Sequence, residues 1–421
     1  MSTRPLRIQF VLTSLPIGGA ETLLLNMVRT MDRLNFAAEV VCLKDPGELG
    51  PVMAAEVPVH SNFIGKKWDV RVLWRLAKHF QQRQADAVIT IGAGDKMFWG
   101  RLAAKLANVP VICSALHSTG WPDGVGRLNR LLTPITGGFI AVAKEHAKHM
   151  VSWEKFPENK VFMIPNGVDT NRFKPDVLQR LWLRKELKLD SSVNLVGIVA
   201  ALRHEKNHLQ FVSGATQVLQ SHPNTHFVIV GDGPERPTIE SAIAQTGCQN
   251  HFHLLGSRSD TEKIVAGLDV FCLTSRNEAN PVSILEALAC CVPVVSPNVG
   301  SIHETVLPLE TGILTEPLDA EETSRAICHL LRSPDLAKQL GQNGRNLVVG
   351  NWSLEAMVEG YQSLVEQLYN RAALKSGQTL WARQSLQSET PSIATAAAEI
   401  SPTVNLLDVG IPTFSPTTLP C

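Results

Sequence analysis

A short segment near residue 280 has the features of a binding site at a helix N-terminus. In the sequence SRNEANPVSILEA (275–287), Asn280 and Pro281 are a favourable N-cap and first helical residue, so we expect a helix to begin there. The first backbone N–H groups of a helix have no partner within it. Those around Val282 and Ser283 would therefore bind an anion or a hydroxyl group.

Two carboxylates accompany this helix. Glu278 precedes it and Glu286 lies about two turns along it, so the two side chains could contact different parts of one elongated ligand. The alternative is that Glu278 is an exposed loop acid and Glu286 a solvated helix residue. The apolar residues around Glu286 weigh against that alternative, because an unpaired carboxylate is costly to bury.

Basic and imidazole side chains follow two predicted strands. Arg203 and Lys206 lie close together in ALRHEKNH (201–208), where they could converge on one anion or could be separate surface charges. His117 follows the run VICSA (111–115), at the strand end where site residues gather in α/β folds. A turn histidine paired with the backbone is the alternative for His117.

Glycine-rich turns join other predicted strands to predicted helices. Gly18 and Gly19 follow the first strand, and Gly233 lies in the turn GDGPE (231–235) after another. Glycines at such turns let backbone N–H groups approach a ligand at the start of a helix, or they serve only to make the turn tight.

Short β-branched runs alternate with amphipathic helical patterns, which predicts an α/β fold. The runs interpreted as strands are 8–13, 37–43, 87–92, 111–115, 139–143, 161–165, 194–200, 226–231, 251–256, 269–275 and 292–297. Continuous apolar strands separated by helices indicate buried parallel sheets with right-handed crossovers. Because so many strands exceed one ordinary open sheet, we expect two Rossmann-like domains.

The strand pattern lapses between Asp169 and Ser192, which places the domain boundary in that segment. We assign 1–185 and 186–350 to the two Rossmann-like domains. Residues 351–375 are interpreted as a C-terminal helix that packs back toward the N-terminal domain. The remaining segment, 376–421, is rich in Ser, Thr and Pro and is interpreted as a flexible tail.

The charge balance limits the kinds of partner. The chain of 421 residues has 39 Lys and Arg against 39 Asp and Glu, so its formal net charge is zero. This argues against a nucleic-acid partner and requires any bound anion to be held by a few placed groups. The eight cysteines lack metal-ligand spacing, so we expect no metal site and interpret them as free thiols of a cytoplasmic protein.

Taken together and in this order, the motifs resemble the family-4 retaining glycosyltransferases of the GT-B fold. The matching segments are LPIGGAE (15–21), VFMIPNGVDTNRFKP (161–175), EKNH (205–208), VGDGPE (230–235), Glu278 to Glu286, EALACCVPVV (286–295) and VGSIHETV (299–306). The resemblance implies two Rossmann-like domains whose parallel sheets face each other across a cleft. The first would lie on the acceptor side and the second would bind a nucleotide sugar.

The activity that this resemblance implies is the retaining transfer of a sugar from a nucleotide-diphosphate-sugar donor. The acceptor would be a glycan or lipid-linked glycan in cell-surface polysaccharide or glycolipid synthesis, contacted by loops around Trp121 and Arg127. No metal or other cofactor would be needed. Within the same fold, a sugar-nucleotide epimerase or a phosphorylase is an alternative, and so is a sugar-nucleotide-binding protein without catalysis.

The resemblance also implies roles for single residues. Lys206 and Arg203 would neutralise the departing diphosphate. Glu278 and His117 would contact the donor sugar, and Glu286 would bind the ribose hydroxyls. The other donor-binding positions would be Gly18, Gly19, Gly233, Asn280, Pro281, Val282 and Ser283.

Three positions depart from the usual family pattern. Ala201 stands where the arginine of the basic pair is usual, so Arg203 would replace that arginine from a neighbouring position. Ala279 and Cys291 stand where glycines are usual. We expect altered loop packing at both, with Ala279 narrowing the donor-sugar pocket.

The stretch 68–83 is a basic amphipathic pattern with a single apolar stripe. The stripe consists of Val70, Leu73, Trp74, Ala77 and Phe80. We expect it to pack against the N-terminal sheet. The alternative is a weak peripheral contact with the inner membrane face, where lipid-linked acceptors would reside.

Overall fold

The structure is a computed structural model that describes residues 4–65, 69–117 and 126–384, without the side chains of 126–128. Two parallel sheets lie within one compact unit that ends at Arg383. The α/β class and the division of the strands into two sheets, both predicted from the sequence, are confirmed.

The first sheet has the strand order β3-β2-β1-β4-β5-β6-β7, with every neighbouring pair parallel. Its strands are β1 (Leu6–Leu12), β2 (Phe36–Cys42), β3 (Val59–His60), β4 (Ala87–Ile91), β5 (Val111–Ala115), β6 (Gly138–Ala141) and β7 (Val161–Met163). Its helices are α1 (Gly19–Thr30), α2 (Gly50–Ala54), α3 (Val72–Gln82), α4 (Asp95–Leu106), α5 (Gly126–Leu131) and α6 (Lys144–Ser152). The two-residue strand β3 carries no periodic signal and is missed by the sequence pattern.

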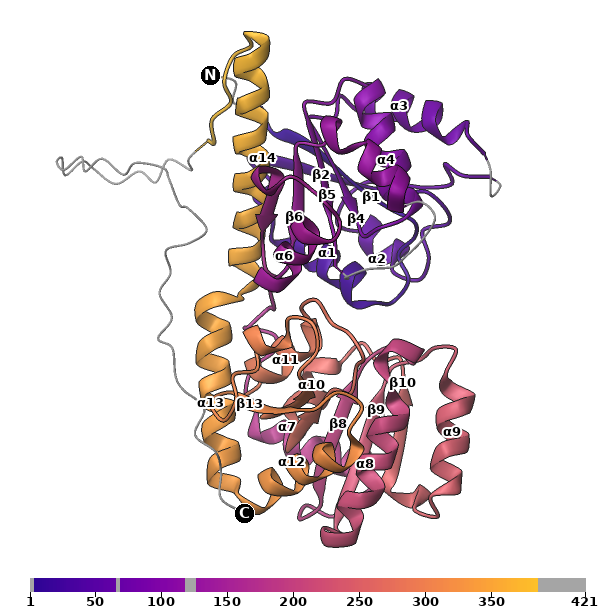
Figure 1. The fold of residues 1–421 in the computed structure, drawn as a ribbon, viewed down its shortest axis with the longest axis vertical. Coiled ribbons are helices and arrows are strands. Elements are labelled where there is room, and N and C mark those ends of the chain that lie inside the picture. The colour runs from indigo at the N-terminus through magenta and orange to yellow at the C-terminus, as the bar shows by residue number, and fades with distance from the viewer. Residues whose placement is uncertain (1–3, 66–68, 118–125, 385–421) are drawn as a thin grey trace, which may run out of the picture. The chain divides into compact units, whose positions relative to one another are not determined.

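Both faces of this sheet are covered, as its continuous apolar strands require. Successive residues of a strand point to opposite faces. Ile8 and Phe10 of β1 therefore join a core on the α1 side, whereas Val11 joins a core formed with α3 and α4 (Figure 1).

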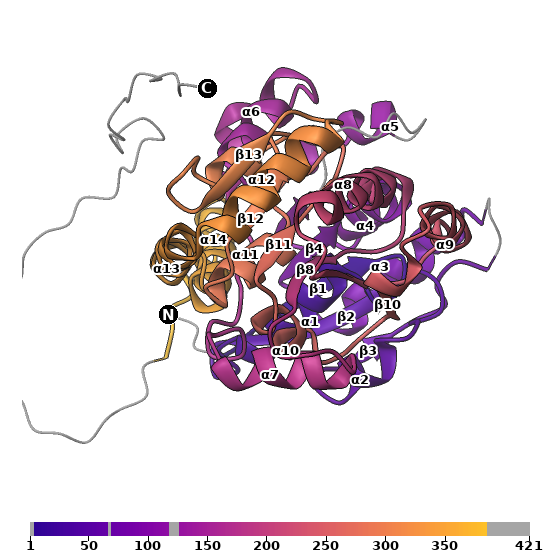
Figure 2. The ribbon, with the colours of Figure 1, turned by 90° about the horizontal axis from the view of Figure 1, so that it is seen from below.

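The second sheet has the order β10-β9-β8-β11-β12-β13, again with parallel pairs throughout. Its strands are β8 (Asn194–Val199), β9 (Thr225–Val230), β10 (Phe252–Gly256), β11 (Val270–Cys272), β12 (Val294–Pro297) and β13 (Gly312–Thr315). Its helices are α7 (Val177–Glu186), α8 (His208–Ser221), α9 (Arg236–Gln245), α10 (Thr261–Ala266), α11 (Val282–Ala289), α12 (Ala320–Arg332) and α13 (Pro334–Asn351), and α14 (Leu354–Ser376) follows. Helices α8, α9 and α12 pack in one layer, whereas α7 packs on α10 and α11 on α13 (Figure 2).

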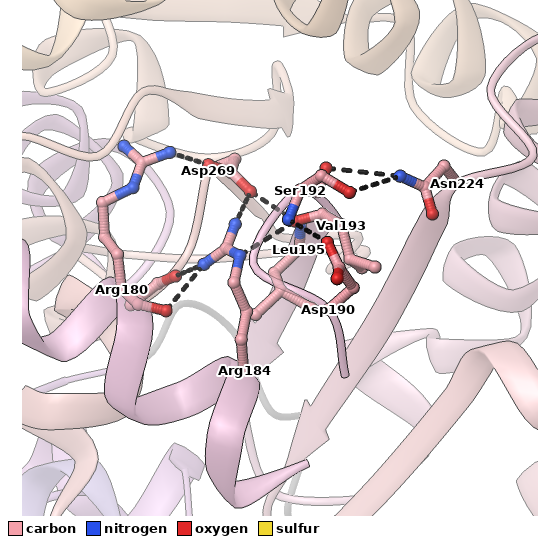
Figure 3. Close-up of polar contacts among 9 residues, drawn as sticks. Arg180, Arg184, Asp190, Ser192, Val193, Leu195, Asn224 and Asp269 are labelled. Atoms are coloured by element: carbon pink, nitrogen blue, oxygen red, sulfur yellow. Dashed lines mark hydrogen bonds and ion pairs between the residues drawn. The ribbon is translucent and has the colours of Figure 1, made fainter. Parts of the chain in front are cut away.

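Helix α7 is fixed to the second sheet by an ion-pair network around the buried Arg184 (Figure 3). The Arg184 guanidinium donates to Asp269 Oδ2 at 2.5 Å and to the carbonyl oxygen of Val193 at 2.9 Å. Arg180 pairs with the other oxygen of Asp269, and the backbone N–H of Leu195 donates to Oδ2 at 2.7 Å. The second hydrophobic core therefore begins before residue 186, where the sequence pattern places the boundary, and it already includes Leu183 of α7.

Helix α14 packs on the first sheet although it follows the second in sequence. Its residues Met357 and Tyr361 are buried in the core formed with α1. Beyond α14, the buried Trp381 donates from Nε1 to the carbonyl oxygen of Arg4 at 2.8 Å and packs on Phe36. The compact unit thus continues past residue 376, where composition predicts the tail to begin, and residues 385–421 lie outside the described part of the chain.

The apolar stripe expected on α3 is divided in the structure, which corrects the sequence interpretation. Ala77 and Phe80 are buried against the sheet, but Val70 and Trp74 are each 64% exposed. The buried face of the helix, which begins at Val72, uses Val72 and Leu76 in their place. No helix in the described part of the chain is long and apolar enough to cross a membrane.

The cysteines in the described part of the chain are free thiols, as the sequence predicts. The seven described cysteines form no disulfide, and five of them are buried. Cys291, which stands where the family usually has glycine, follows the C-cap of α11 with φ of 57°. This left-handed conformation at a helix C-terminus is the one that glycine adopts most readily, which explains the family preference.

Candidate active site

The candidate site residues lie on loops that leave the carboxyl ends of the parallel strands. In the second sheet, β8 leads to Arg203 and Lys206, and its neighbour β11 leads to Glu278. In the first sheet, β1 leads to the Gly18–Gly19 turn and β5 leads to His117. Open α/β sheets bind their ligands at this edge.

The loops after β8 and β11 are joined by an ion pair. Lys206 Nζ lies 2.5 Å from Glu278 Oε1, and the Ser275 hydroxyl donates to the same oxygen at 2.7 Å. The Glu278 side chain is only 10% exposed. The exposed loop acid considered as an alternative is therefore excluded for Glu278.

Backbone contacts hold the same two loops together. The N–H of Arg276 donates to the carbonyl oxygen of Glu205 at 2.8 Å. The Thr274 hydroxyl lies 3.2 Å from the carbonyl oxygen of Lys206 and 3.1 Å from that of Asn207. The ion pair thus sits on a rigid frame and does not depend on two flexible side chains alone.

Arg203 does not join Lys206, contrary to the convergence considered from their spacing. Its side chain is 57% exposed, and Glu205 is 4.0 Å from its guanidinium. Arg203 acts electrostatically on Glu21 of α1, where it helps Lys96 to oppose the rise in the Glu21 pKa that burial causes. Arg203 thus has only a weak electrostatic influence on α1, whereas Lys206 pairs directly with Glu278.

The turn after β1 leaves the first N–H groups of α1 without a side-chain cap. Gly18 is the N-cap and Gly19 the first helical residue. The carboxylate of Glu21 folds back toward this turn, since a Cβ built on Gly18 would lie 2.6 Å from Glu21 Oε2. Glu21 and Lys96 are thus ionisable neighbours of this turn. The sequence motifs assign no role to either residue.

Gly233 keeps the loop after β9 in close contact with the loop after β8. A Cβ on Gly233 would lie 2.5 Å from the carbonyl oxygen of Leu202, which immediately precedes Arg203. The N–H of Leu202 in turn donates to the carbonyl oxygen of Asp232 at 3.0 Å. The direct contacts of Gly233 are therefore with the loop that carries Arg203.

Helix α11 begins one residue later than the sequence pattern predicts. Pro281, and not Asn280, is its N-cap, and no side chain caps the first turn at Val282 and Ser283. The carbonyl oxygen of Asn280 instead accepts a hydrogen bond from Asn166 Nδ2 at 2.7 Å. The uncapped N–H groups expected at the start of α11 are present. Asn280, however, is not the N-cap, and its backbone carbonyl pairs with Asn166.

Glu286 and His117 are both uncharged at neutral pH. Burial raises the pKa of Glu286 to about 8, an effect that Arg172 opposes and Glu262 reinforces. Burial lowers the pKa of His117 to about 4, with a smaller opposing effect from a hydrogen bond to Asn166 and a further lowering by Lys96. Both groups would therefore offer a bound ligand hydrogen bonds and no charge.

One group of residues in the described part of the chain has metal-ligand spacing, and it lies away from these loops. The ligand atoms of Glu39, His60 and His79 lie within 4.8 Å of one another. Glu39 already accepts hydrogen bonds from Arg83 and from Gln9 Nε2. Because Arg83 and Gln9 occupy the carboxylate, these residues form a half-buried hydrogen-bond network that is unsuited to a cation.

Comparison with known proteins assigns the chain to a family. The model for Glycosyltransferase Family 4 matches residues 17–172, and the model for Glycosyl transferases group 1 matches residues 180–347. The chain is a family-4 glycosyltransferase. The two matches divide it between β7 and β8, where the strand pattern lapses.

Relatives and solved structures agree with this family. The glycosyltransferase is 25% identical to the UDP-Gal:alpha-D-GlcNAc-diphosphoundecaprenol alpha-1,3-galactosyltransferase of Escherichia coli, over 84% of this chain and 95% of that protein. It is 27% identical to the N-acetyl-alpha-D-glucosaminyl L-malate synthase of Bacillus anthracis, over 72% and 81%. Its fold matches that of Anabaena HepE in complex with UDP and glucose, with a TM-score of 0.76 at 20% identity over 85% and 98% of the chains. The GT-B fold predicted from the motifs is thereby confirmed.

Sequence reasoning missed a residue that supports Glu278 in this glycosyltransferase. Gly300 has φ of 55°, and a Cβ there would lie 1.8 Å from the carbonyl oxygen of Glu278. The next residue, Ser301, donates its N–H to that oxygen at 3.1 Å. The only sequence signal was a glycine inside the family segment 299–306.

Trp121, expected near the acceptor, and the Arg127 side chain lie outside the described part of the chain.

We expect Gly300→Ala to lower the rate of donor turnover by about 100-fold, the cost of displacing a site group by about 1 Å. The added methyl group would push the Glu278 backbone away and would also strain a left-handed position. The measurement is the initial rate of nucleotide release from the sugar donor. The matched control is Gly350→Ala in α13, where nothing lies within 4 Å of the added atom. Equal rates for the two variants would contradict the role of Gly300.

We expect the difference in unfolding free energy between the Glu286→Gln variant and the wild type to depend on pH. The folded state holds the Glu286 proton up to about pH 8, whereas the unfolded chain releases it near the ordinary carboxyl pKa of 4.5. Raising the pH between these values therefore costs the wild type stability that the glutamine variant keeps.

Denaturant unfolding of both proteins at pH 5, 7 and 9 measures this difference. The unfolding free energy of Glu286→Gln relative to the wild type should rise from pH 5 to pH 9. The matched control is the same substitution at an exposed carboxyl group, Glu310→Gln. A pH-independent difference for Glu286→Gln would show that burial does not hold its proton.

Proposed function

We propose that this glycosyltransferase moves a sugar, with retention at the anomeric carbon, from a nucleotide-diphosphate-sugar to a glycan or lipid-linked glycan. The observation that carries the proposal is the Lys206–Glu278 ion pair between the loops after β8 and β11. It places one cation and one hydrogen-bond acceptor together, next to the uncapped first turn of α11. A diphosphate needs the cation, and sugar hydroxyl groups need the acceptor.

The diphosphate would be stabilised as it leaves by groups already in place. Negative charge grows on the leaving phosphate during transfer, and preorganised donors aimed at that charge lower the barrier. Lys206 would exchange Glu278 for a phosphate oxygen, which frees the carboxylate to accept from the donor sugar. Arg203, exposed and near the turn after β1, would reach the same diphosphate by moving its side chain.

Two uncharged groups would orient the rest of the donor. A protonated Glu286 on α11 would both donate to and accept from the ribose hydroxyls. His117, neutral and partly buried, would donate one hydrogen bond to the donor sugar without adding charge near the reacting carbon. Since Lys206, Arg203 and helix N-termini supply the positive potential, the proposal includes no metal ion.

The acceptor class is supported by the relatives and by α3. The Escherichia coli relative is named for a diphosphoundecaprenol-linked acceptor. Val70 and Trp74 are exposed beside the exposed Lys78, which would suit a weak contact with an anionic membrane surface. We therefore propose synthesis of a cell-surface polysaccharide or glycolipid, by a protein that touches the inner membrane face only peripherally.

A thermal-shift panel identifies the donor and tests the role of Lys206. The panel contains UDP-galactose, UDP-glucose, UDP-N-acetylglucosamine, GDP-mannose and ADP-glucose, each with and without EDTA. A donor at 100 times its Kd should stabilise the protein by about 2.7 kcal/mol. Lys206→Ala should weaken that donor by about tenfold to a hundredfold, the loss of a charged hydrogen bond. The exposed Lys338 on α13 provides the control variant Lys338→Ala.

Product analysis then tests transfer and its stereochemistry. The selected donor and an N-acetylglucosamine-diphospholipid acceptor should give a new glycosidic bond with the anomeric configuration of the donor. An inverted product would contradict retention. An epimerised donor would indicate an epimerase, and a sugar phosphate would indicate a phosphorylase. Donor binding without any turnover would indicate a binding protein. EDTA-sensitive turnover would contradict a metal-free site.

A further inference from the structure

The start of α6, which follows the first sheet's strand β6, is capped by a side chain from the second-sheet part of the chain. That side chain is Glu304, which follows β12 in the family segment 299–306. The N–H of Lys144 donates to Glu304 Oε2 at 2.9 Å, and the N–H of Glu145 donates to Oε1 at 2.8 Å. The proposed function so far gives this contact no part.

Glu304 supplies a cap that α6 does not find in its own sequence. The N-cap of α6 is Ala143, and no side chain of the turn before the helix caps it. The first N–H groups of a helix are unpaired within it and carry partial positive charge, so a carboxylate is a favourable partner. Because each oxygen of Glu304 accepts one N–H, the contact fixes both the distance and the orientation of the carboxylate relative to α6.

The backbone that carries Glu304 is held next to Glu278. Ile302 is fully buried in the second hydrophobic core. The N–H of Glu304 donates to the carbonyl oxygen of Ser301 at 3.0 Å, and the N–H of Ser301 donates to that of Glu278 at 3.1 Å. A displacement of Glu304 would therefore reach Glu278 through a single turn of backbone.

The other side of the contact leads to His117. Strands β5 and β6 are paired, and the N–H of Leu116 donates to the carbonyl oxygen of Ile140 at 3.0 Å. Leu116 immediately precedes His117, and β6 runs through Ala141 into the turn before α6. His117 and the start of α6 thus follow two hydrogen-bonded strands at the same edge of the first sheet.

We propose that Glu304 is a positioning residue that sets the separation between His117 and Glu278 by capping α6. It acts through the backbone on both sides and need not touch the donor. The inference rests on the proposed function for the roles of His117 and Glu278. The two hydrogen bonds to α6 do not rest on it.

Hydrogen exchange at the start of α6 tests the contact without any measurement of activity. Amides in the first turn of a helix have no partner within the helix, so protection of Lys144 and Glu145 in the wild type would come from Glu304. In Glu304→Ala both amides should exchange about 10- to 100-fold faster, the range for losing a hydrogen bond to a charged group. Glu310→Ala, at an exposed acid between β12 and β13, is the matched control and should leave both rates unchanged.

Activity supplies the second readout. With UDP-galactose, or another nucleotide sugar of the panel that the wild type turns over, Glu304→Ala should lower kcat by about 10- to 100-fold per folded molecule. The KM for the donor should change by less than about threefold, because the donor is held mainly by groups of the second-sheet part. Glu310→Ala should keep the wild-type kcat.

Lys144→Pro breaks the same contact from the other side. Proline has no N–H, yet it is favoured at the first position of a helix, which Lys144 occupies, and the extended backbone of Ala143 suits the residue before a proline. Lys144→Pro should lower kcat by about 3- to 10-fold, the range for losing one hydrogen bond. Its control is Lys144→Ala, which keeps the N–H and should keep the wild-type kcat. Because both variants break one contact, adding Lys144→Pro to Glu304→Ala should lower kcat no further.

Wild-type exchange rates at Lys144 and Glu145 in folded Glu304→Ala would overturn the contact. Faster exchange with an unchanged kcat would overturn its positioning role. If Glu304→Ala does not fold, the comparison of Lys144→Pro with Lys144→Ala decides, by kcat and by exchange at the Glu145 amide. If the wild type turns over no nucleotide sugar, the proposed function fails while the exchange rates still test the contact, so the two failures are distinguishable.

Discussion

The hydrogen bonds that join the loop after β8 to the loop after β11 are the constraint on which the site depends. These loops are far apart in sequence and adjacent only because β8 and β11 are neighbours in the second sheet. Parallel strands with right-handed crossovers bring their carboxyl ends to one edge, and the Arg276–Glu205 backbone contact fixes the two loops there. Lys206 and Glu278 can then form a short ion pair with little loss of side-chain freedom. Gly300 and Ser301 hold the backbone of Glu278 from the opposite side.

The electrostatics of the site follow from burial more than from the number of charges. The chain as a whole has no net charge, so attraction of an anionic ligand depends on a few local groups. Lys206 is the partly buried cation, whereas Arg203 is exposed and interacts weakly. Burial keeps Glu286 and His117 neutral, so neither of these two groups would add charge beside a bound diphosphate.

Much of this architecture can be predicted from the sequence because it depends on local patterns. Continuous β-branched runs fix the strands, and a proline after Asn280 marks the helix start to within one residue. The two carboxylates and the lysine were identified by residue type and spacing, and the structure brings Lys206 and Glu278 into contact. Buried free thiols follow from the absence of ligand spacing among the cysteines.

The remaining features depend on tertiary contacts that a sequence pattern does not contain. Gly300 is required because it meets a carbonyl oxygen more than twenty residues away in sequence. Trp74 lies on the predicted apolar stripe, yet it is exposed, and Val72 and Leu76 occupy the buried face of α3. Trp381 lies past the predicted start of the tail but is buried against Phe36. In each case the tertiary surroundings, and not the residue type, determine whether the residue is buried, exposed or required to be glycine.

A double-mutant cycle on donor affinity tests the central claim most directly. Calorimetric Kd values for the donor should be compared among the wild type, Lys206→Ala, Glu278→Gln and the double variant. If the ion pair and the donor share these two groups, the effects should be non-additive by about 1 kcal/mol or more. Additivity to within about 0.3 kcal/mol would show that Lys206 and Glu278 do not act as one donor-binding unit.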